Sequence, residues 1–400
     1  MKSVLREVSN RQQFFTETLN HPKTYTETDD EIKAILKSAL PKIQVWGIGG
    51  AGNNAVNRLT NLGVEGAEMI AVNTDAQHLL SVVADKKLLI GKETTRGFGA
   101  GNAPKIGELS AIESAEEIKD MLDADLVFVT YGLGGGTGTG AGPVVAKLAR
   151  EKGALAVVTC TMPFRMEGVK RLQNAVEGLE RIQEISDTLV LVPNERLLQL
   201  APDITMKSGF LIADEVLVRS VKGITELIMR PQLINLDFAD VRRVVANGKI
   251  GMIGYGESDS QNHRVEEAVR ETLENPLLCD VDVSTAKRAL ICISGGDSLS
   301  LAEAQEAVFK ISNQIDPNAE VIWGASIEPE LNNTLRIICI LSEVYSSLTK
   351  VPSRGFGKLI DDFPDVSSSA QTHIPMEEDD SPSIIQNTKR GRFRRKSISS

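Results

Sequence analysis

The stretch from Gly132 to Gly142 constrains the fold of this 400-residue chain more than any other, because seven of its eleven residues are glycine. It follows the apolar run Leu126–Val129 and precedes an apolar-periodic segment that starts at Pro143. This order predicts a strand, a glycine loop and a helix with proline at its first position. Glycines let successive backbone N–H groups converge, and a helix N-terminus adds partial positive charge, so the stretch predicts a phosphate cradle. A flexible linker is a weaker interpretation, since linkers do not normally join a buried strand to such a helix.

A second glycine loop lies upstream, where Gly47, Gly49 and Gly52 follow the apolar run Ile43–Trp46. Their spacing fits the dinucleotide pattern G-x-G-x-x-G, and Asp75 stands about 20 residues on, where a ribose-binding acid belongs. Taken alone, this favours an NAD-dependent dehydrogenase. A richer phosphate loop about 85 residues downstream instead favours a mononucleotide triphosphate that is held from two sides. The pattern G-x-x-x-x-G-K-[ST] is absent from the sequence, which argues against the common P-loop enzymes.

Several motifs in the same order resemble the tubulin/FtsZ family of polymerising GTPases. The signature loop of that family is matched by the residues from Gly134 to Gly140, and the resemblance covers roughly residues 41–345. The other matching segments are Gly49–Asn54, Asn73–Gln77, Gly99–Pro104, Pro163–Gly168, Pro193–Leu198 and Asn235–Arg242. The resemblance implies a GTP-hydrolysing, filament-forming cell-division protein. The sequence Gly-Asn-Ala-Pro at 101–104 and the long N-terminal extension are more similar to archaeal than to bacterial members.

The chain is expected to have an α/β fold, with a parallel-sheet nucleotide-binding domain joined by a long central helix to a smaller α/β domain. The expected segments are an N-terminal extension at 1–40, a GTP-binding domain at 41–207, the central helix at 208–230, a C-terminal domain with the hydrolysis-activating loop at 231–346, and a disordered linker with a basic tail at 347–400. Strands are predicted near 43–48, 68–73, 126–131, 155–161, 188–192, 249–256, 288–294, 320–327 and 335–342. Helices are predicted near 263–273 and 301–313.

The resemblance implies that GTP or GDP binds to both glycine loops and to residues near them. Backbone donors are expected from the loops, and Thr137 is the expected hydroxyl contact to phosphate. The implied nucleotide contacts are Gly49, Gly50, Ala51, Gly52, Asn53, Asn73, Gly101, Gly134, Gly135, Gly136, Thr137, Gly138, Thr139 and Gly140. Mg²⁺ is expected to be held mainly by nucleotide phosphates and water, and protein ligands for it are not predicted.

Two further pairs are implied to contact ribose, phosphate and base. Glu167 and Arg171 are four residues apart, which on one helix face is ordinarily an exposed ion pair. The resemblance instead assigns them to ribose and phosphate. Asn194 and Asp214 match the base contacts of the family, with Phe210 stacking near the base. Helical spacing favours Asp214 over its neighbour Glu215 for that role, although either acid could face the pocket.

The segment Asn235–Asp240 carries two acids three residues apart at a helix start, and such acids are usually caps. Because this segment follows the long helix, it is expected at the opposite end from the glycine loops. The resemblance implies that it inserts into the next subunit. Asp237 and Asp240 would then orient the attacking water there, with Asn235 helping to align it. An alternative is a scaffold protein that binds GTP without hydrolysing it. The presence of both acids argues against this alternative.

Bulk composition bounds the partners. A net charge of −10 and only 4% aromatic residues argue against specific nucleic-acid binding. Four cysteines without C-x-x-C spacing and no apolar signal core fit a cytoplasmic protein. The resemblance implies that it acts at the mid-cell division site. It also implies that its partners are other copies of the chain, assembled head to tail, and division-ring and membrane-tethering proteins. The basic cluster Lys389–Lys396 favours contact with anionic lipid or neighbouring filaments, with a solvated tail or nucleic-acid attraction as alternatives.

Overall fold

The computed structural model describes residues 40–64, 66–195, 205–229, 237–246, 249–274 and 281–346. All of them belong to one compact unit, Met1–Phe356. The expectations for the N-terminal extension up to residue 39, for Asn235 and for the linker and tail at 347–400 concern residues outside these ranges.

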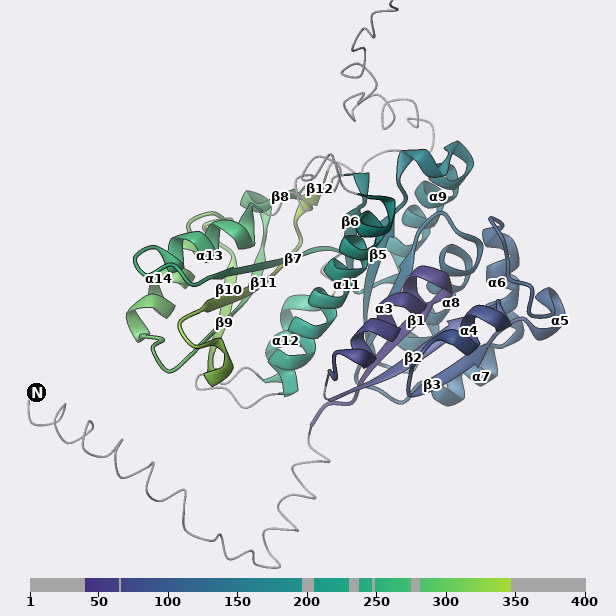
Figure 1. Cartoon of the computed structure of the whole chain (residues 1–400), viewed down its shortest axis with the longest axis horizontal. Coiled ribbons are helices and arrows are strands. Elements are labelled where there is room, and N and C mark those ends of the chain that lie inside the picture. Colours follow the sequence, from purple (N-terminus) through teal and green to yellow (C-terminus); the bar gives the residue numbers. More distant parts are fainter. Residues whose placement is uncertain are drawn as a thin grey trace, which may run out of the picture. The chain divides into compact units, whose positions relative to one another are not determined.

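Within the described residues, ten strands form one sheet in the order β10-β9-β11-β7-β6-β5-β4-β1-β2-β3 (Figure 1). Every neighbouring pair from β3 to β7 is parallel, whereas β11 runs antiparallel to both β7 and β9. The strands are β1 Ile43–Ile48, β2 Ala67–Asn73, β3 Lys86–Leu89, β4 Leu126–Gly132, β5 Leu155–Met162, β6 Thr188–Pro193, β7 Lys249–Ser258, β9 Arg288–Gly295, β10 Glu320–Ile327 and β11 Leu335–Ser342. The short strands β8 Val281–Asp282 and β12 Tyr345–Ser346 pair separately.

The two halves of the chain share this sheet. β6 pairs with β7 over three residues, from Thr188 opposite Lys249 to Val190 opposite Gly251. The predicted strands are confirmed to within two residues, and the α/β fold class is confirmed with them. No strand was predicted at β3, whose four residues carry only a short apolar pattern, or at the two-residue strands β8 and β12.

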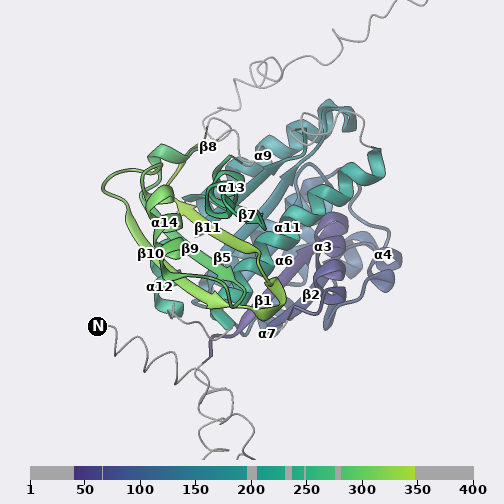
Figure 2. The same ribbon diagram turned by 60° about the vertical axis from the view of Figure 1, so that its left-hand side comes forward.

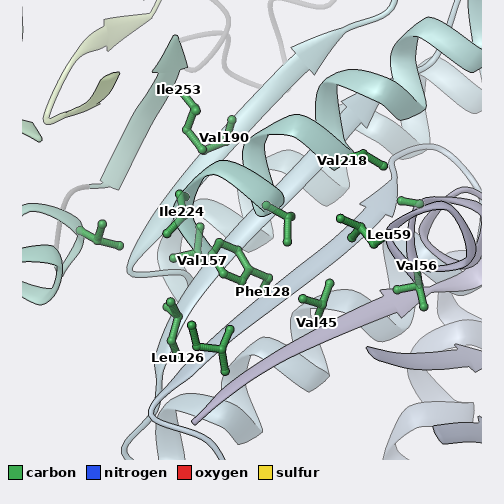
Figure 3. Close-up of a cluster of buried hydrophobic side chains, with 14 of the residues drawn as sticks. Val45, Val56, Leu59, Leu126, Phe128, Val157, Val190, Val218, Ile224 and Ile253 are labelled. Carbon is green, nitrogen blue, oxygen red and sulfur yellow. The ribbon is translucent and has the colours of Figure 1, made fainter. Parts of the chain in front are cut away.

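Helices cover both faces of the sheet. The α-helices are α3 Gly49–Asn61, α4 Ala76–Ser81, α5 Lys92–Thr95, α6 Pro104–Glu113, α7 Ala115–Met121, α8 Gly136–Glu151, α9 Val169–Ile185, α11 Met206–Met229, α12 Phe238–Val245, α13 Arg264–Leu273 and α14 Leu301–Ser312. The 3₁₀ turns are η1 Arg165–Glu167, η3 Val283–Thr285 and η4 Pro329–Leu331. Successive residues of β4 point to opposite faces of the sheet. Leu126 and Phe128 lie on the face that packs against α3 and α11, in the buried cluster of Figure 3.

The long helix α11 crosses the sheet and contacts α3, β5, β6 and β7 (Figures 1 and 2). Its 24 residues span about 36 Å at 1.5 Å per residue. Val218, Val221 and Ile224 are almost fully buried against the sheet. At its last residue, Met229, the side chain packs on Gly66, which directly precedes β2. The helix therefore ends at the amino edge of the parallel strands.

Two helices begin earlier than the sequence analysis expected. α3 starts at Gly49 rather than at Ala55, and α8 starts at Gly136, so Pro143 lies inside the helix and not at its first position. The reason is close packing. A Cβ on Gly140 would lie 2.0 Å from the carbonyl oxygen of Pro104, so this turn of α8 lies directly against α6. Tertiary contact thus holds in a helix a glycine run that has poor helix propensity.

Candidate nucleotide-binding site

Both glycine segments lie at the carboxyl edge of the parallel strands. β1 and β4 are neighbours in the sheet, and each leads directly into a helix that starts in its glycine segment. A Cβ on Gly49 would lie 3.0 Å from the backbone nitrogen of Gly138 and 3.2 Å from the Cβ of Thr137. Gly49 also has a φ of +70°, which L-residues rarely adopt. The two segments therefore touch, as a two-sided phosphate cradle requires.

Three helix N-termini at this edge carry no acid and no side-chain cap. Ile48, Gly135 and Ala103 precede α3, α8 and α6, and within the described residues none of them makes a side-chain cap hydrogen bond. By contrast, α7, α12, α13 and α14 all have acidic residues in their first turns. Uncapped N–H groups and the positive end of the helix dipole favour an anion. These three helix starts therefore have the features of an anion-binding site.

The glycines of the site have two distinct roles. A Cβ on Gly50 or Gly135 would meet nothing within 4 Å, so their backbones are open to a ligand. Gly136 packs instead on the 99–104 loop, where its N–H donates to the carbonyl of Gly101 at 2.8 Å. Gly134 has a φ of +91° and lies against the backbone of Arg171. Only part of the glycine run is therefore open to a ligand.

Hydroxyl and amide side chains fix the loops to one another. The Oγ1 atoms of Thr74 and Thr137 are 2.7 Å apart, which joins the end of β2 to the first turn of α8. Thr139 is buried, and its Oγ1 accepts the N–H of Gly134 at 2.8 Å. Asn73 is also buried, and its Oδ1 accepts the N–H of Thr74 at 2.9 Å. Thr137 remains half-buried, whereas Thr139 and Asn73 are buried and bind the backbone of the loops.

Glu167 and Arg171 form the expected ion pair but do not share one helix. Glu167 ends the 3₁₀ turn η1, and Gly168, with a φ of +99°, separates it from α9. The Nε of Arg171 is 3.1 Å from Oε2 of Glu167, and Oε1 accepts the N–H of Phe164 at 2.8 Å. The prediction that Glu167 and Arg171 share one helix was wrong, because Gly168 interrupts the backbone between η1 and α9. The pair lies beside the cradle, since the backbone of Arg171 contacts Gly134.

Buried amides without partners mark the floor of the site. Asn194 directly follows β6 and is 5% exposed, and its Oδ1 has no hydrogen-bond partner among the described residues. An unpaired buried acceptor is costly, so it points to a ligand donor. Asn53 is fully buried and both of its amide atoms lack partners within the same residues. Its neighbour Asn54, which is also in α3, is exposed.

Phe210 and Asp214 lie in the first half of α11, but their side chains are outside what the structure describes. Their neighbour Glu215 forms an ion pair with Arg58 of α3, with 2.7 Å between Oε2 and Nη2. That contact occupies Glu215 on the α3 side.

Asp237 and Asp240 are on α12, away from the cradle. Oδ1 of Asp237 accepts the N–H of Asp240 at 2.9 Å, and Oδ2 of Asp240 accepts the N–H of Asp237 at 3.3 Å. This is the capping box that the sequence pattern allows. α11 ends at the amino edge of the strands, and the C-terminal end of α12 accepts a hydrogen bond from Thr188, the first residue of β6. The acids therefore belong to the opposite edge from the glycine segments.

Other expectations are resolved within the described residues. Asp75 caps α4 by accepting the N–H of His78 at 3.0 Å, so it is engaged locally and does not stand free as a ribose acid. Cys160, Cys292 and Cys339 are free and buried, as expected, and burial raises the pKa of Cys339 to about 12. Among these residues, no group of three His, Cys, Asp or Glu side chains could hold a metal ion. Nor is any helix in the described part of the chain long and apolar enough to cross a membrane.

The fold and the site define a nucleotide-binding α/β protein whose phosphate cradle is built from two glycine segments. Residues 42–202 match the GTPase-domain model of the tubulin/FtsZ family, and residues 249–345 match the C-terminal domain model of the FtsZ family. The chain belongs to the tubulin/FtsZ family. It therefore has a GTPase domain and binds GTP or GDP.

Curated and solved relatives agree with this assignment. The chain is 54% identical over 319 residues to cell division protein FtsZ 1 of Pyrococcus horikoshii, which covers 80% of this chain and 85% of that one. It is 50% identical over 349 residues to FtsZ 1 of Methanocaldococcus jannaschii, covering 87% and 94%. A solved FtsZ dimer from M. jannaschii superposes with a TM-score of 0.74 at 52% identity, covering 80% and 92%. These relatives are archaeal, as the Gly-Asn-Ala-Pro motif at 101–104 indicated.

Proposed function

We propose that this protein hydrolyses GTP at sites completed by head-to-tail assembly, and that its filaments organise cell division. The curated relatives are cell division proteins, and the solved relative is a dimer. The observation that carries the proposal is the separation of the cradle from Asp237 and Asp240, which lie at opposite edges of the sheet. A chain arranged in this way cannot complete its own hydrolytic site. A second copy stacked head to tail can.

In the proposed site, the backbones of Gly50 and Gly135 and the uncapped turns of α3 and α8 bind the phosphates. Gly52, Gly138 and Gly140 hold the loops close by packing, with Ala51, Gly49, Gly134, Gly136 and Gly101 shaping the same edge. Thr137 donates its hydroxyl to a phosphate oxygen. Glu167 and Arg171 contact ribose and phosphate beside the cradle.

Asn194 and Asp214 read the guanine edge, with Phe210 packing near the base. The unpaired Oδ1 of Asn194 suits a base donor, and a carboxylate at Asp214 would accept from guanine N1–H and the exocyclic amine. Asn53 and Asn73 support the loops beneath the nucleotide.

Hydrolysis requires charge neutralisation, in-line geometry and an oriented water rather than covalent help. Asp237 and Asp240 of one subunit would accept hydrogen bonds from the water that attacks the γ-phosphate in the next, and Asn235 would help to align it. Bound Mg²⁺ would neutralise charge on the phosphates, to which it is proposed to bind together with water. The orienting acids distinguish this reading from a scaffold that binds GTP without turnover.

The test is GTPase activity per molecule as a function of protein concentration. Shared sites require activity per molecule to rise above a threshold concentration, because isolated subunits lack the acids. Asp240→Ala should retain GTP binding but lose roughly 10²–10⁴-fold in turnover, the usual contribution of a positioned acid–base group. Constant activity per molecule down to nanomolar protein would contradict the proposal.

The finer assignments extend this proposal to the whole chain. We place its action in the cytoplasm at the division site, with division-ring and membrane-tethering proteins as partners. The segments 41–207, 208–230 and 231–346 act as the nucleotide domain, the central helix and the domain that carries the hydrolysis-activating loop. The basic cluster Lys389–Lys396 contributes contact with anionic lipid or with neighbouring acidic filaments.

A further inference from the structure

The C-terminal end of α12 is held by side chains from three different strands. Helix ends leave carbonyl groups without partners, and most helices satisfy them locally. Here the hydroxyl of Ser342 in β11 donates to the carbonyl of Val244 at 2.6 Å. The hydroxyl of Thr188 in β6 donates to the carbonyl of Val245 at 2.5 Å. Ser342 is fully buried and Thr188 is 1% exposed.

A third donor comes from β9. Nη1 of Arg288 donates to the carbonyls of Arg243 and Ala246, each at 3.2 Å. Its Nη2 is 3.2 Å from Oε1 of Glu343, which fixes the direction of the guanidinium. Four successive carbonyls at the C-terminal end of α12, from residue 243 to the capping residue 246, thus accept side-chain hydrogen bonds. We call Thr188, Arg288 and Ser342 the α12 clamp.

The clamp spans the joint between the two halves of the sheet. Thr188 opens β6, the last strand of the nucleotide-binding half, and it pairs with Lys249 at the start of β7. Arg288 and Ser342 belong to β9 and β11, in the other half. The end of α12 therefore has a fixed position relative to both halves.

The opposite end of α12 carries the Asp237–Asp240 capping box. The helix has eight residues and is about 12 Å long. Val241, Val244 and Val245 are buried along its inner face, and the clamp holds the C-terminal end of the helix in place. In so short a helix, a tilt at one end displaces the other by a similar amount. Misplacing a catalytic group by about 1 Å can cost on the order of 10²-fold in rate.

We propose that Thr188, Arg288 and Ser342 are positioning residues for GTP hydrolysis. They hold α12 so that Asp237 and Asp240 meet the nucleotide of the adjacent subunit in the correct geometry. The inference rests on the proposed function of these acids. It assigns to the clamp an effect on turnover that a simple helix cap would not have.

The test compares Thr188→Val with Thr272→Val. Both threonines are almost fully buried, and the hydroxyl of Thr272 also donates to a helix carbonyl, that of Ala268, at 2.7 Å. Thr272 lies in α13, which carries no proposed site residue. Both substitutions keep side-chain volume and remove one buried hydrogen bond. Ser342→Ala is the second clamp variant, in case Thr188→Val does not fold.

Three readouts are measured for each variant: the GTP dissociation constant, the amount of pelleted polymer, and turnover per polymerised subunit at saturating GTP. The clamp variants should lose about tenfold in turnover while GTP affinity and polymer mass stay within twofold of wild type. Thr272→Val should change turnover by less than twofold. If the clamp and control variants have equal turnover per polymerised subunit, or if the clamp variants lose polymer mass while turnover per polymerised subunit stays at the wild-type value, the positioning role is wrong.

A double-mutant cycle with Asp240→Ala separates this inference from the proposed function. If the clamp acts through the acids, adding Thr188→Val to Asp240→Ala should lower turnover by clearly less than the tenfold expected in the wild-type background, because only Asp237 is left to be misplaced. Additive losses would contradict positioning. If Asp240→Ala alone retains wild-type turnover, the proposed function fails, whatever the clamp variants do.

Discussion

At the residue scale, the site depends on which glycines face solvent and which face backbone. Gly50 is exposed and has open space where a Cβ would lie. A Cβ on Gly140 would instead lie 2.0 Å from the carbonyl oxygen of Pro104. Both are in helices and neither needs a positive φ. The sequence shows them as equivalent members of glycine-rich loops, and only packing separates them.

This difference predicts opposite behaviour for two alanine variants. Gly140→Ala places a methyl group against the backbone of α6. It should therefore destabilise the protein by about 1–3 kcal/mol, as overpacking does. Gly50→Ala should leave the free energy of unfolding unchanged or slightly raised but weaken GTP binding, because its methyl group faces the ligand. Urea unfolding and nucleotide titration test the pair. Equal stability of the two variants would contradict the packing assignment.

The proposed role of Asp214 in reading the guanine base gives a second prediction at this scale. Asp214→Asn replaces an acceptor with a group that also donates, which leaves polar atoms on the guanine edge unpaired. GTP affinity should fall by about 1–3 kcal/mol, the cost of an unsatisfied buried group. Glu215→Gln is the control, since Glu215 is paired with Arg58. Unchanged preference for GTP over ATP and XTP would exclude Asp214 as the reader.

At the element scale, periodicity predicted nine strands, the central helix and the helices near 263–273 and 301–313, because a half-buried surface imposes it on the sequence. It could not predict that α8 begins at Gly136, since helix propensity opposes a glycine run and contact with α6 decides the outcome. The same limit applies to Glu167 and Arg171, whose spacing fits one helix although Gly168 breaks it. The acids of α12 were correctly predicted as caps from spacing. The clamp at the other end of that helix comes from strands distant in sequence and left no local signal.

Packing between α13 and α14 gives a prediction on pH. Arg264 of α13 donates to both oxygens of Glu303 in α14, at 2.5 and 2.8 Å, which lowers the pKa of Glu303 to about 2. A lowered folded-state pKa contributes stability that is present above the unfolded value, about 4.3, and is lost as pH falls through about 2.

Glu303→Gln should therefore cost on the order of 1 kcal/mol at pH 6, after allowance for solvent screening. The difference from wild type should shrink as pH falls from 5 to 2. Urea unfolding across this range, without nucleotide, is the measurement. Glu306→Gln, an exposed glutamate on the same helix 3.6 Å from Lys310, is the control. A difference that grows toward low pH would contradict the pairing.

At the scale of the whole molecule, the proposed basic tail can be tested by truncation after Thr388. Basic residues near an anionic membrane contribute about 1 kcal/mol each, and repetition along a filament multiplies the effect. The full chain should co-sediment with anionic vesicles or bundle at low salt more than the truncated chain, and added salt should remove the difference. Identical behaviour at low salt would leave only the solvated-tail interpretation.

The central claim is that one subunit supplies the nucleotide and the next supplies the acids. The most direct measurement mixes Asp240→Ala, which should bind GTP but lack an orienting acid, with Asp214→Asn, which keeps the acids but binds GTP poorly. At GTP concentrations that saturate only the first variant, interfaces between the two restore a complete site. The account predicts GTPase activity in the mixture well above the sum of the separate variants. A mixture no more active than that sum would contradict a shared active site.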